Sequence, residues 1–275
     1  MGLLVKMTYQ DSFNGTAAIQ GFIAERKKLG RPFTEINCPT SIKNLAQSLS
    51  FKMGDEVSTI FIQKEDVSVE LGSPQRESVS YIVIGSPTEL HDGRITLIGP
   101  DIPESAGKEL NFGQVLLIGG TTIPDLEYKE MERALFHLQN LEGFMIRAIP
   151  NKLWARVNRQ AVQRGFSFET LGKALMIMYR QQFKSIETME LIFITTDTPK
   201  DFLELRVIGS EVRKKYLKTY SDSLKTRLAK LTEKQRADCD NPWSCDECDY
   251  NEVCDEIQDI VDKMKVYRAR KEASK

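Results

Sequence analysis

The sequence lacks any apolar run that approaches the roughly 18 residues needed for a membrane-spanning helix, so we expect no membrane span. The first ten residues carry one lysine and only a very short apolar stretch, which is too little for a secretion signal. Histidine is also scarce. Neither His91 nor His137 lies beside a cysteine or a serine-rich turn, and His137 falls in a predicted amphipathic helix, where a structural role is favoured over catalysis.

A charge excess is missing too. The 275 residues include 38 lysines and arginines and 39 aspartates and glutamates, which gives a net charge of −1. Proteins that bind a phosphate backbone usually carry a basic excess, so nucleic acid is not the expected partner. Cysteine is rare over most of the chain, because four of the five lie near the C-terminus. That distribution does not match a secreted disulfide framework and predicts a reducing, cytoplasmic setting.

Hydrophobic periodicity predicts an α+β fold. Helices are expected at residues 12–29, 42–49, 125–142, 153–164, 169–183 and 210–235, where apolar residues recur at helical spacing. Strands are expected at residues 57–63, 80–84, 94–98, 114–118 and 190–195, and Asp92-Gly93 suggests a hairpin that joins residues 89–91 to 94–98. Strands and helices come in blocks, so a mixed sheet with packed helices is favoured over a doubly wound sheet.

The composition changes sharply toward the C-terminus. The long helix expected at residues 210–235 is basic, whereas residues 238–259 are acidic and contain the four clustered cysteines. We therefore expect an α+β domain at residues 1–224, followed by a small cysteine-rich metal-binding segment with a C-terminal helix at residues 225–275.

The four clustered cysteines have the pattern of a metal or cluster site. Cys239, Cys245, Cys248 and Cys254 are separated by five, two and five residues. A two-residue gap lets two sulfurs approach one centre from a single turn. Cys254 lies near the start of a predicted helix, whose free N–H groups favour an anionic centre. The pattern predicts an iron–sulfur cluster held by all four thiolates.

Other interpretations of the cysteines stay open. Zinc is the main alternative, although an all-cysteine zinc site normally uses two short pairs and only one pair here is short. Two disulfides are disfavoured by the reducing setting, and four buried unligated thiols are disfavoured by the polarity of the segment. The surrounding acidic residues suit either metal centre and would attract a basic docking surface, but they also suit a plain solvated helix start.

Elsewhere the sequence offers weaker candidates for chemistry. Trp154 and Arg156 fall in a predicted helix and could touch a coenzyme or a partner, although packing is the default for the tryptophan. Cys38 precedes a proline and is expected to be a core or loop residue. Gly119-Gly120 follows a strand and predicts a tight turn, not a phosphate-binding loop. The basic helix at residues 213–230 suits an acidic partner, the chain's own acidic segment or a solvated face.

A series of short passages has a recognisable order. The passages are Ile84, Asp92–Ile102, Trp154–Val157, Ala161–Phe168, Leu171–Gly172, Lys215–Tyr216, Leu231–Thr232, Ser244–Cys248 and Val253–Cys254. Over about residues 50–256 their order and approximate spacing resemble the acetyl-CoA synthase subunit of carbon monoxide dehydrogenase/acetyl-CoA synthase, also called the beta subunit of the acetyl-CoA decarbonylase/synthase complex. The chain resembles the central domain of that family plus the opening of its cluster domain.

The resemblance implies a family that joins a methyl group from a corrinoid protein, carbon monoxide and coenzyme A at a nickel–iron–sulfur site. It implies that Cys245, Cys248 and Cys254 hold a [4Fe–4S] cluster and that Cys248 corresponds to the residue that bridges to nickel. The family's fourth cluster cysteine lies in a downstream setting that this sequence lacks, so Cys239 would take its place. The family's Cys-Gly-Cys nickel motif has no counterpart either, so we expect no complete nickel site and no acetyl synthesis by this chain alone.

Three functions are compatible with these observations. The first is an auxiliary iron–sulfur protein of anaerobic one-carbon metabolism that transfers electrons or docks a corrinoid protein or a subunit of the carbon monoxide dehydrogenase/acetyl-CoA synthase type. The second is one part of a methyl- or acyl-transfer enzyme that another subunit completes. The third is a structural interaction module stabilised by zinc.

Overall fold

The computed structural model describes residues 13–54, 62–104, 107–121, 123, 125–134, 141–149 and 152–236. The helices are α1 (Gly15–Lys28), α2 (Ile42–Ser48), α3 (Asp125–Ala134), α4 (Arg159–Gln163), α5 (Phe168–Gln182) and α6 (Pro199–Arg236), with short 3-10 helices η2 (Lys64–Asp66) and η3 (Pro87–Glu89). The strands are β1 (Phe33–Asn37), β2 (Val67–Leu71), β3 (Ser78–Gly85), β4 (Arg94–Ile98), β5 (Lys108–Leu110), β6 (Phe112–Gly119), β7 (Phe144–Ile149), β8 (Lys152–Asn158) and β9 (Thr188–Ile194). None of the described helices is long and apolar enough to cross a membrane.

The chain separates into two compact units, residues 1–214 and 215–275. The division lies inside α6, upstream of the boundary expected from composition at residues 224 and 225, and that boundary stays a prediction. We call the described part of the first unit, residues 13–214, the sheet domain.

Two sheets form the centre of the sheet domain. A five-stranded mixed sheet has the order β1-β4-β9-β6-β3, in which β4 is parallel to β9 and β6 to β3 while the other neighbours are antiparallel. A four-stranded sheet has the order β5-β2-β8-β7, in which β5 and β2 are parallel and the other neighbours are antiparallel. The predicted α+β class with a mixed sheet and packed helices is therefore confirmed.

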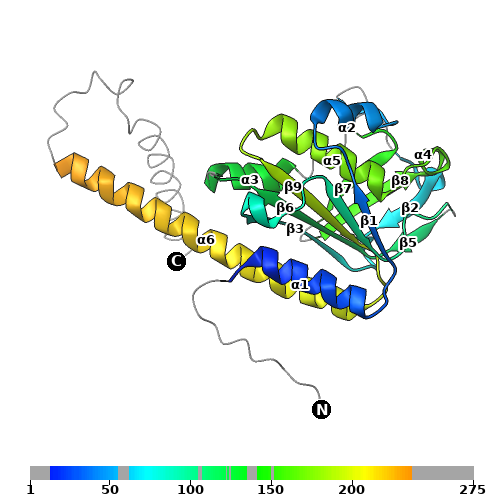
Figure 1. Ribbon diagram of the computed structural model, residues 1–275, viewed down its shortest axis with the longest axis horizontal. Coiled ribbons are helices and arrows are strands. Elements are labelled where there is room, and N and C mark those ends of the chain that lie inside the picture. Colours follow the sequence, from blue (N-terminus) through cyan, green and yellow to red (C-terminus); the bar gives the residue numbers. More distant parts are fainter. Residues whose placement is uncertain are drawn as a thin grey trace, which may run out of the picture. The chain divides into compact units, whose positions relative to one another are not determined.

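Helices cover both faces of the five-stranded sheet (Figure 1). Strand register places Ile95 of β4 and Ile82 of β3 on the same face of the sheet. Tyr81, the residue before Ile82, therefore points to the opposite face. On the Ile95 side lies α5, where a Cβ added to Gly172 would come within 2.4 Å of Ile95. On the Tyr81 side lie α1 and the first half of α6, and a Cβ added to Gly209 of α6 would come within 2.8 Å of the Tyr81 ring. Glycine allows the close helix–sheet contact on each face.

Three buried phenylalanines form the centre of the core on the α5 side. Phe112 of β6, Phe168 of α5 and Phe193 of β9 have ring centroids 5.1 to 6.2 Å apart, and each is at most 1% exposed. Complete burial of one such side chain contributes about 1.5–3 kcal/mol. The cluster therefore joins α5 to the neighbouring strands β6 and β9.

Ser78 connects the two sheets. Its hydroxyl donates to the carbonyl of Leu153 at 2.6 Å and accepts the N–H of Leu153 at 3.0 Å, which links β3 to β8. Gly72 has a φ of 65°, and an added Cβ would lie 2.4 Å from the same carbonyl. The close approach of the backbones at this point therefore requires glycine at position 72.

Most of the predicted elements are confirmed. The helices expected at residues 12–29, 42–49 and 169–183 correspond to α1, α2 and α5, and the strands expected at residues 80–84, 94–98, 114–118 and 190–195 correspond to β3, β4, β6 and β9. The strand expected at residues 57–63 lies mostly outside the described residues. The helix expected at residues 210–235 is confirmed but begins earlier, at Pro199, because Phe202, Leu205 and Ile208 already pack their side chains in the core.

The helix predicted at residues 153–164 is wrong. Residues 152–158 form β8, with Leu153, Ala155 and Val157 buried at alternate positions, and only the following five residues form a helix, α4. The Asn158 side chain accepts the N–H of Gln160 at 2.8 Å and so caps α4 at the point where the strand ends.

Two further predictions are corrected. Residues 87–89 form η3, so Asp92-Gly93 does not join two strands of a hairpin, and β4 pairs instead with β1 and β9. The helix predicted at residues 125–142 is described as helix only to Ala134. It does not extend to position 142, because Leu141 is buried in a bridge to Met53 and Gly143 adopts a φ of 78°.

Candidate functional site

The predicted cluster ligands Cys239, Cys245, Cys248 and Cys254 lie outside the described residues, as does His137. Within the described ranges, no group of three or more His, Cys, Asp or Glu side chains is arranged to hold a metal ion. The side-chain geometry that the structure provides is therefore that of the sheet domain, which precedes the cysteines. Three of its features stand out: the passage at residues 92–101, the Trp154–Arg156 face of β8, and the base of α6.

Asp92 and Gly93 fix the start of β4. A carboxylate oxygen of Asp92 accepts the N–H of Met189 at 2.8 Å and pairs with the guanidinium of Arg180 on α5. Gly93 has a φ of 80°, and an added Cβ would lie 2.5 Å from the carbonyl oxygen of Cys38. The two residues therefore hold β4, β9 and α5 together.

Arg94 continues this arrangement with a buried ion pair. Its Nη2 lies 2.6 Å and its Nε 2.8 Å from Oε1 of Glu190, whose side chain is completely buried in β9. The other oxygen of Glu190 accepts the N–H of His91 at 3.3 Å. Removing one partner of such a buried pair typically costs about 3–5 kcal/mol, because the remaining charge has no counterion. We therefore assign Arg94 and Glu190 a structural role.

Asp101 ends the passage by capping α5. Its Oδ1 accepts the N–H of Phe168, the first residue of α5, at 3.0 Å and the N–H of Ile102 at 2.7 Å. The carbonyl of Pro100 accepts the hydroxyl of Thr195 at 2.6 Å, which ties the end of β4 to the end of β9. A carboxylate near a helix N-terminus is stabilised by the free N–H groups there. The polar residues from Asp92 to Asp101 thus serve the architecture of the domain.

Trp154 and Arg156 share one carboxylate. Both lie on strand β8, and their side chains donate to Glu70 of β2, from Nε1 of Trp154 at 2.9 Å and from Nε of Arg156 at 2.9 Å. The Arg156 guanidinium carbon lies 5.2 Å from the Trp154 ring centroid. Glu70 neutralises Arg156 and fixes the orientation of the Trp154 indole. The three side chains can therefore present an aromatic edge beside an ion pair without net charge. They do not concentrate positive charge as an anion site would.

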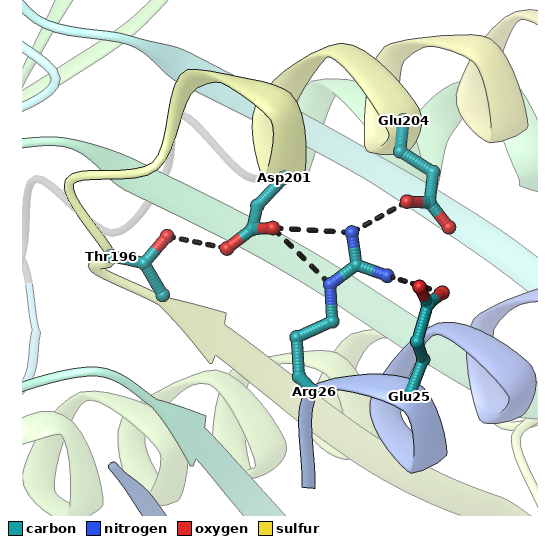
Figure 2. Close-up of polar contacts among 5 residues, drawn as sticks. All are labelled: Glu25, Arg26, Thr196, Asp201 and Glu204. Atoms are coloured by element: carbon teal, nitrogen blue, oxygen red, sulfur yellow. Dashed lines mark hydrogen bonds and ion pairs between the residues drawn. The ribbon is translucent and has the colours of Figure 1, made fainter. Parts of the chain in front are cut away.

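The base of α6 is held by a buried arginine (Figure 2). Nη2 of Arg26 on α1 lies 3.2 Å from Asp201 and 2.5 Å from Glu204, both in the first turns of α6, and Nη1 lies 3.1 Å from Glu25. Asp201 also accepts the hydroxyl of Thr196 at 2.8 Å. Burial alone would lower the pKa of Arg26, but the contacts with Glu204 and Asp201 outweigh it and raise the pKa above its ordinary value. The guanidinium therefore stays charged and fastens α6 to α1.

The weaker candidates also have structural explanations. Cys38 is buried, and this burial raises the pKa of its thiol, which disfavours a reactive thiolate. His91 lies exposed before β4. Gly119 is the last residue of β6, and beyond it the Thr121 N–H and hydroxyl both donate to Glu187.

Sequence reasoning missed the buried charges Glu190, Arg26 and Asp201 and the half-buried Glu70. A signal was present for Glu190, because it is the one charged residue in the apolar run of β9 and such a residue requires a partner. Arg26 gave no comparable signal, since it stands among other charged residues at the end of α1.

Residues 49–200 match the family described as the CO dehydrogenase/acetyl-CoA synthase complex beta subunit. Among similar curated proteins is the acetyl-CoA decarbonylase/synthase complex subunit beta 1 of Methanosarcina thermophila, 26% identical over 199 residues, which are 70% of this chain and 40% of the relative. The subunit beta 2 of the same organism is 29% identical over 146 residues, 51% of this chain and 31% of the relative. The subunit beta of Archaeoglobus fulgidus is 31% identical over 147 residues, 52% of this chain and 27% of the relative.

These matches cover only part of this chain and part of each relative. The chain spans less than half the length of these curated relatives. The family match contains the passage at residues 92–101, the Trp154–Arg156 face and α5, and it ends at residue 200, before the four clustered cysteines. The similarity to the family model is therefore a similarity of the sheet domain, and the role of the cysteines depends on the spacing of the cysteines alone.

Proposed function

The chain belongs to the family of the CO dehydrogenase/acetyl-CoA synthase complex beta subunit, and from this premise we propose that it serves such a complex as an auxiliary iron–sulfur subunit. In this role it transfers electrons or docks a partner, either a corrinoid protein or another subunit. The observation that carries the proposal is a family match over residues 49–200 followed by four cysteines within sixteen residues.

The donor set fits an iron–sulfur cluster. Four thiolates are the usual ligands of a [4Fe–4S] cluster, and Cys239, Cys245, Cys248 and Cys254 supply that number. When bound, such a cluster accepts and releases single electrons. The nine acidic residues between positions 238 and 259 surround the thiolates with negative charge, which lowers a cluster's reduction potential and attracts a basic partner surface. The same donors are compatible with zinc, which would stabilise the segment without redox chemistry.

The charges of the sheet domain favour a supporting role over catalysis. Glu190 and Asp201, two acids that are at most 2% exposed, are paired with Arg94 and Arg26. Buried acids with arginine partners are ordinary structural ion pairs. These two ion pairs therefore stabilise the sheet domain itself.

Anaerobic purification of the full chain tests the iron–sulfur proposal. We expect about four iron and four sulfide per chain, with visible absorption that bleaches on reduction. The Cys248→Ser variant should lose this absorption, whereas the Cys38→Ser variant should keep it, because Cys38 lies buried in the sheet domain. Zinc as the only metal, with no visible absorption, would exclude the electron-transfer role and favour the structural zinc module.

Participation in methyl or acyl transfer is the second candidate, favoured by the names of the relatives, which are subunits of decarbonylase/synthase complexes. In this case another subunit completes the centre. Co-purification with nickel and acetyl exchange in the presence of the partner would support it. Isolation as an inert monomer that binds neither a corrinoid protein nor another subunit would contradict both the docking role and this candidate.

A further inference from the structure

The outer surface of the α1–α6 helix pair carries exposed apolar side chains. Leu29, which follows α1, and Leu203 and Val207 of α6 are 61%, 61% and 56% exposed, and in the described part of the chain these are the exposed large hydrophobic residues. Leu203 and Val207 are four residues apart and therefore lie on the same side of α6. Scattered exposed apolar residues need no explanation, but their concentration on one pair of helices indicates an interaction surface.

α1 and the first half of α6 lie side by side and run antiparallel (Figure 1). Arg26, near the end of α1, contacts Asp201 at 3.2 Å, near the start of α6. At the other end of the pair, a Cβ added to Gly15 would come within 2.9 Å of Val212. Both pairs of positions add up to the same number, so the two helices keep one register along this length.

The outward side of α1 consists of small residues beside the apolar residues of α6. Ala17, Gly21 and Ala24 are exposed, and a Cβ added to Gly21 would meet no atom within 4 Å. A glycine inside a helix costs about 1 kcal/mol relative to alanine, and no atom of the described chain lies close enough to require glycine here. By the register of the two helices, Leu203 is level with Ala24, and Val207 is level with Gly21 to within one residue.

This surface is complementary to itself. A two-fold axis parallel to the helices would lay α6 of each copy over α1 of the other and keep every residue at its own level. Leu203 of one copy would then meet Ala24 of the other, and Val207 would meet Gly21. Large side chains of one helix pack into the shallow groove between small side chains of the facing helix. The contact occurs twice and closes, as in an isologous dimer.

The charges at one end of the helix pair also suit a second copy. Arg26 and the three carboxylates around it carry one positive and three negative charges, a net charge of −2 (Figure 2). Lys28 and Lys200 lie at the same end, are exposed, and have no carboxylate partner among the described residues. Across the two-fold axis, these two lysines of each copy face the excess negative charge of the other.

We infer that the outer face of α1 and the first half of α6 is a homodimer interface, in which Leu203 and Val207 of each copy pack on Ala24 and Gly21 of the other. α1 has 14 residues and two neighbouring helices are about 20 Å wide, so this face covers roughly 400 Å² per copy. The total of about 800 Å², before surface roughness is counted, lies at the lower end for specific interfaces. The dimer is therefore weak, and it does not depend on the cysteine segment or on the proposed function.

Sedimentation velocity of the full chain tests the dimer. The four clustered cysteines are replaced by serine, so that neither a metal nor a disulfide can join two copies. Between about 1 µM and 1 mM, the range of weak complexes, the mass should rise from one chain to two. Val207→Glu should keep the chain monomeric, whereas Ala46→Glu, at an exposed position of α2 on the other face of the sheet, should not. A monomer at every concentration, or a dimer that Val207→Glu leaves intact, would overturn the inference.

Gly21→Leu separates the dimer contact from folding. The Cβ of the new side chain meets no atom of its own chain within 4 Å, and leucine is a better helix former than glycine, so the variant should unfold no more easily. In the dimer the leucine occupies the space of Val207 of the other copy, so dimerisation should weaken by about tenfold or more. Circular dichroism in urea checks the folding, and a folded variant that dimerises like the native chain would refute the groove.

Disulfide formation between copies tests the register. Gly21→Cys and Val207→Cys are made in separate chains that also lack the four clustered cysteines, and Cys38 remains because it is buried. Oxidation of the mixture should give a covalent dimer, whereas oxidation of either variant alone should not, because equivalent positions lie on different helices across the axis. A covalent dimer from Val207→Cys alone would place α6 against α6 and overturn the proposed packing, as would a mixture that dimerises without cross-linking.

Discussion

Replacement of Arg26 by methionine should lower the free energy of unfolding of the sheet domain by about 3 kcal/mol. The change removes the guanidinium from Asp201, whose side chain is 3% exposed, and breaking a buried ion pair typically costs about 3–5 kcal/mol. The lower end applies for two reasons. Asp201 keeps its 2.8 Å bond from the Thr196 hydroxyl, and the methionine can cover the Phe22 ring that lies 3.7 Å from the guanidinium carbon. Glu204 is 34% exposed and regains water, so it adds little.

Urea unfolding followed by circular dichroism measures this loss. Arg213→Met is the matched control, because Arg213 is 67% exposed and its contact with Glu132 at 3.5 Å is a surface ion pair expected to contribute less than about 1 kcal/mol. Asp201→Asn in the Arg26→Met background should recover part of the loss, because it removes the unpaired buried charge. A loss below about 1 kcal/mol for Arg26→Met, equal to that of the control, would refute the view that this ion pair fastens α6.

Three smaller predictions follow from other contacts. Gly93→Ala should lower the melting temperature, because a φ of 80° and a Cβ 2.5 Å from the Cys38 carbonyl oxygen strain the backbone. Gly21→Ala in α1, where the added Cβ meets no atom within 4 Å, should instead increase the free energy of unfolding by about 0.5–1 kcal/mol. The Lys52 N–H and the Arg164 guanidinium lower the pKa of Glu142, so its stabilisation is present above the ordinary carboxyl pKa and lost as the pH falls. Glu142→Gln should therefore unfold more easily than the native chain at pH 7, and this difference in stability should shrink as the pH falls below the ordinary carboxyl pKa. Burial raises the pKa of Cys38, so in a chain with the other four cysteines replaced by serine this thiol should react with iodoacetamide far more slowly when folded than in urea; equal rates would contradict its burial.

The elements that could be predicted are those whose apolar pattern is long. In α5, Leu171, Leu175 and Tyr179 recur at helical spacing over 15 residues, and the predicted helix is confirmed. The sequence of β8 imitates a helix because Ala161 and Val162 of α4 follow it closely, are both buried and continue an apparent helical spacing from Trp154 and Val157. A strand and a helix without an intervening loop thus imitate one longer helix.

Edge strands and buried charges could not be predicted from local pattern. β1 is an edge strand in which Thr34, Glu35 and Asn37 are exposed, so it shows no apolar alternation and forms through its pairing with β4. Arg26 and Asp201 are 175 positions apart in the sequence, and only the packing of α1 against α6 makes them partners. The predicted ligands Cys239, Cys245, Cys248 and Cys254 lie outside the described residues, so their assignment still depends on spacing alone.

The position of Asp201 determines how the protein can be divided for biochemical work. A fragment that stops where the family match stops, at residue 200, would lose Asp201 and Glu204, two of the acids that pair with Arg26, and would uncover the strand face around Tyr81, which Leu205 and Gly209 cover in the described structure. Such a fragment should aggregate on expression. Cutting after residue 214 keeps these groups covered, so that is where separate study of the two units should begin.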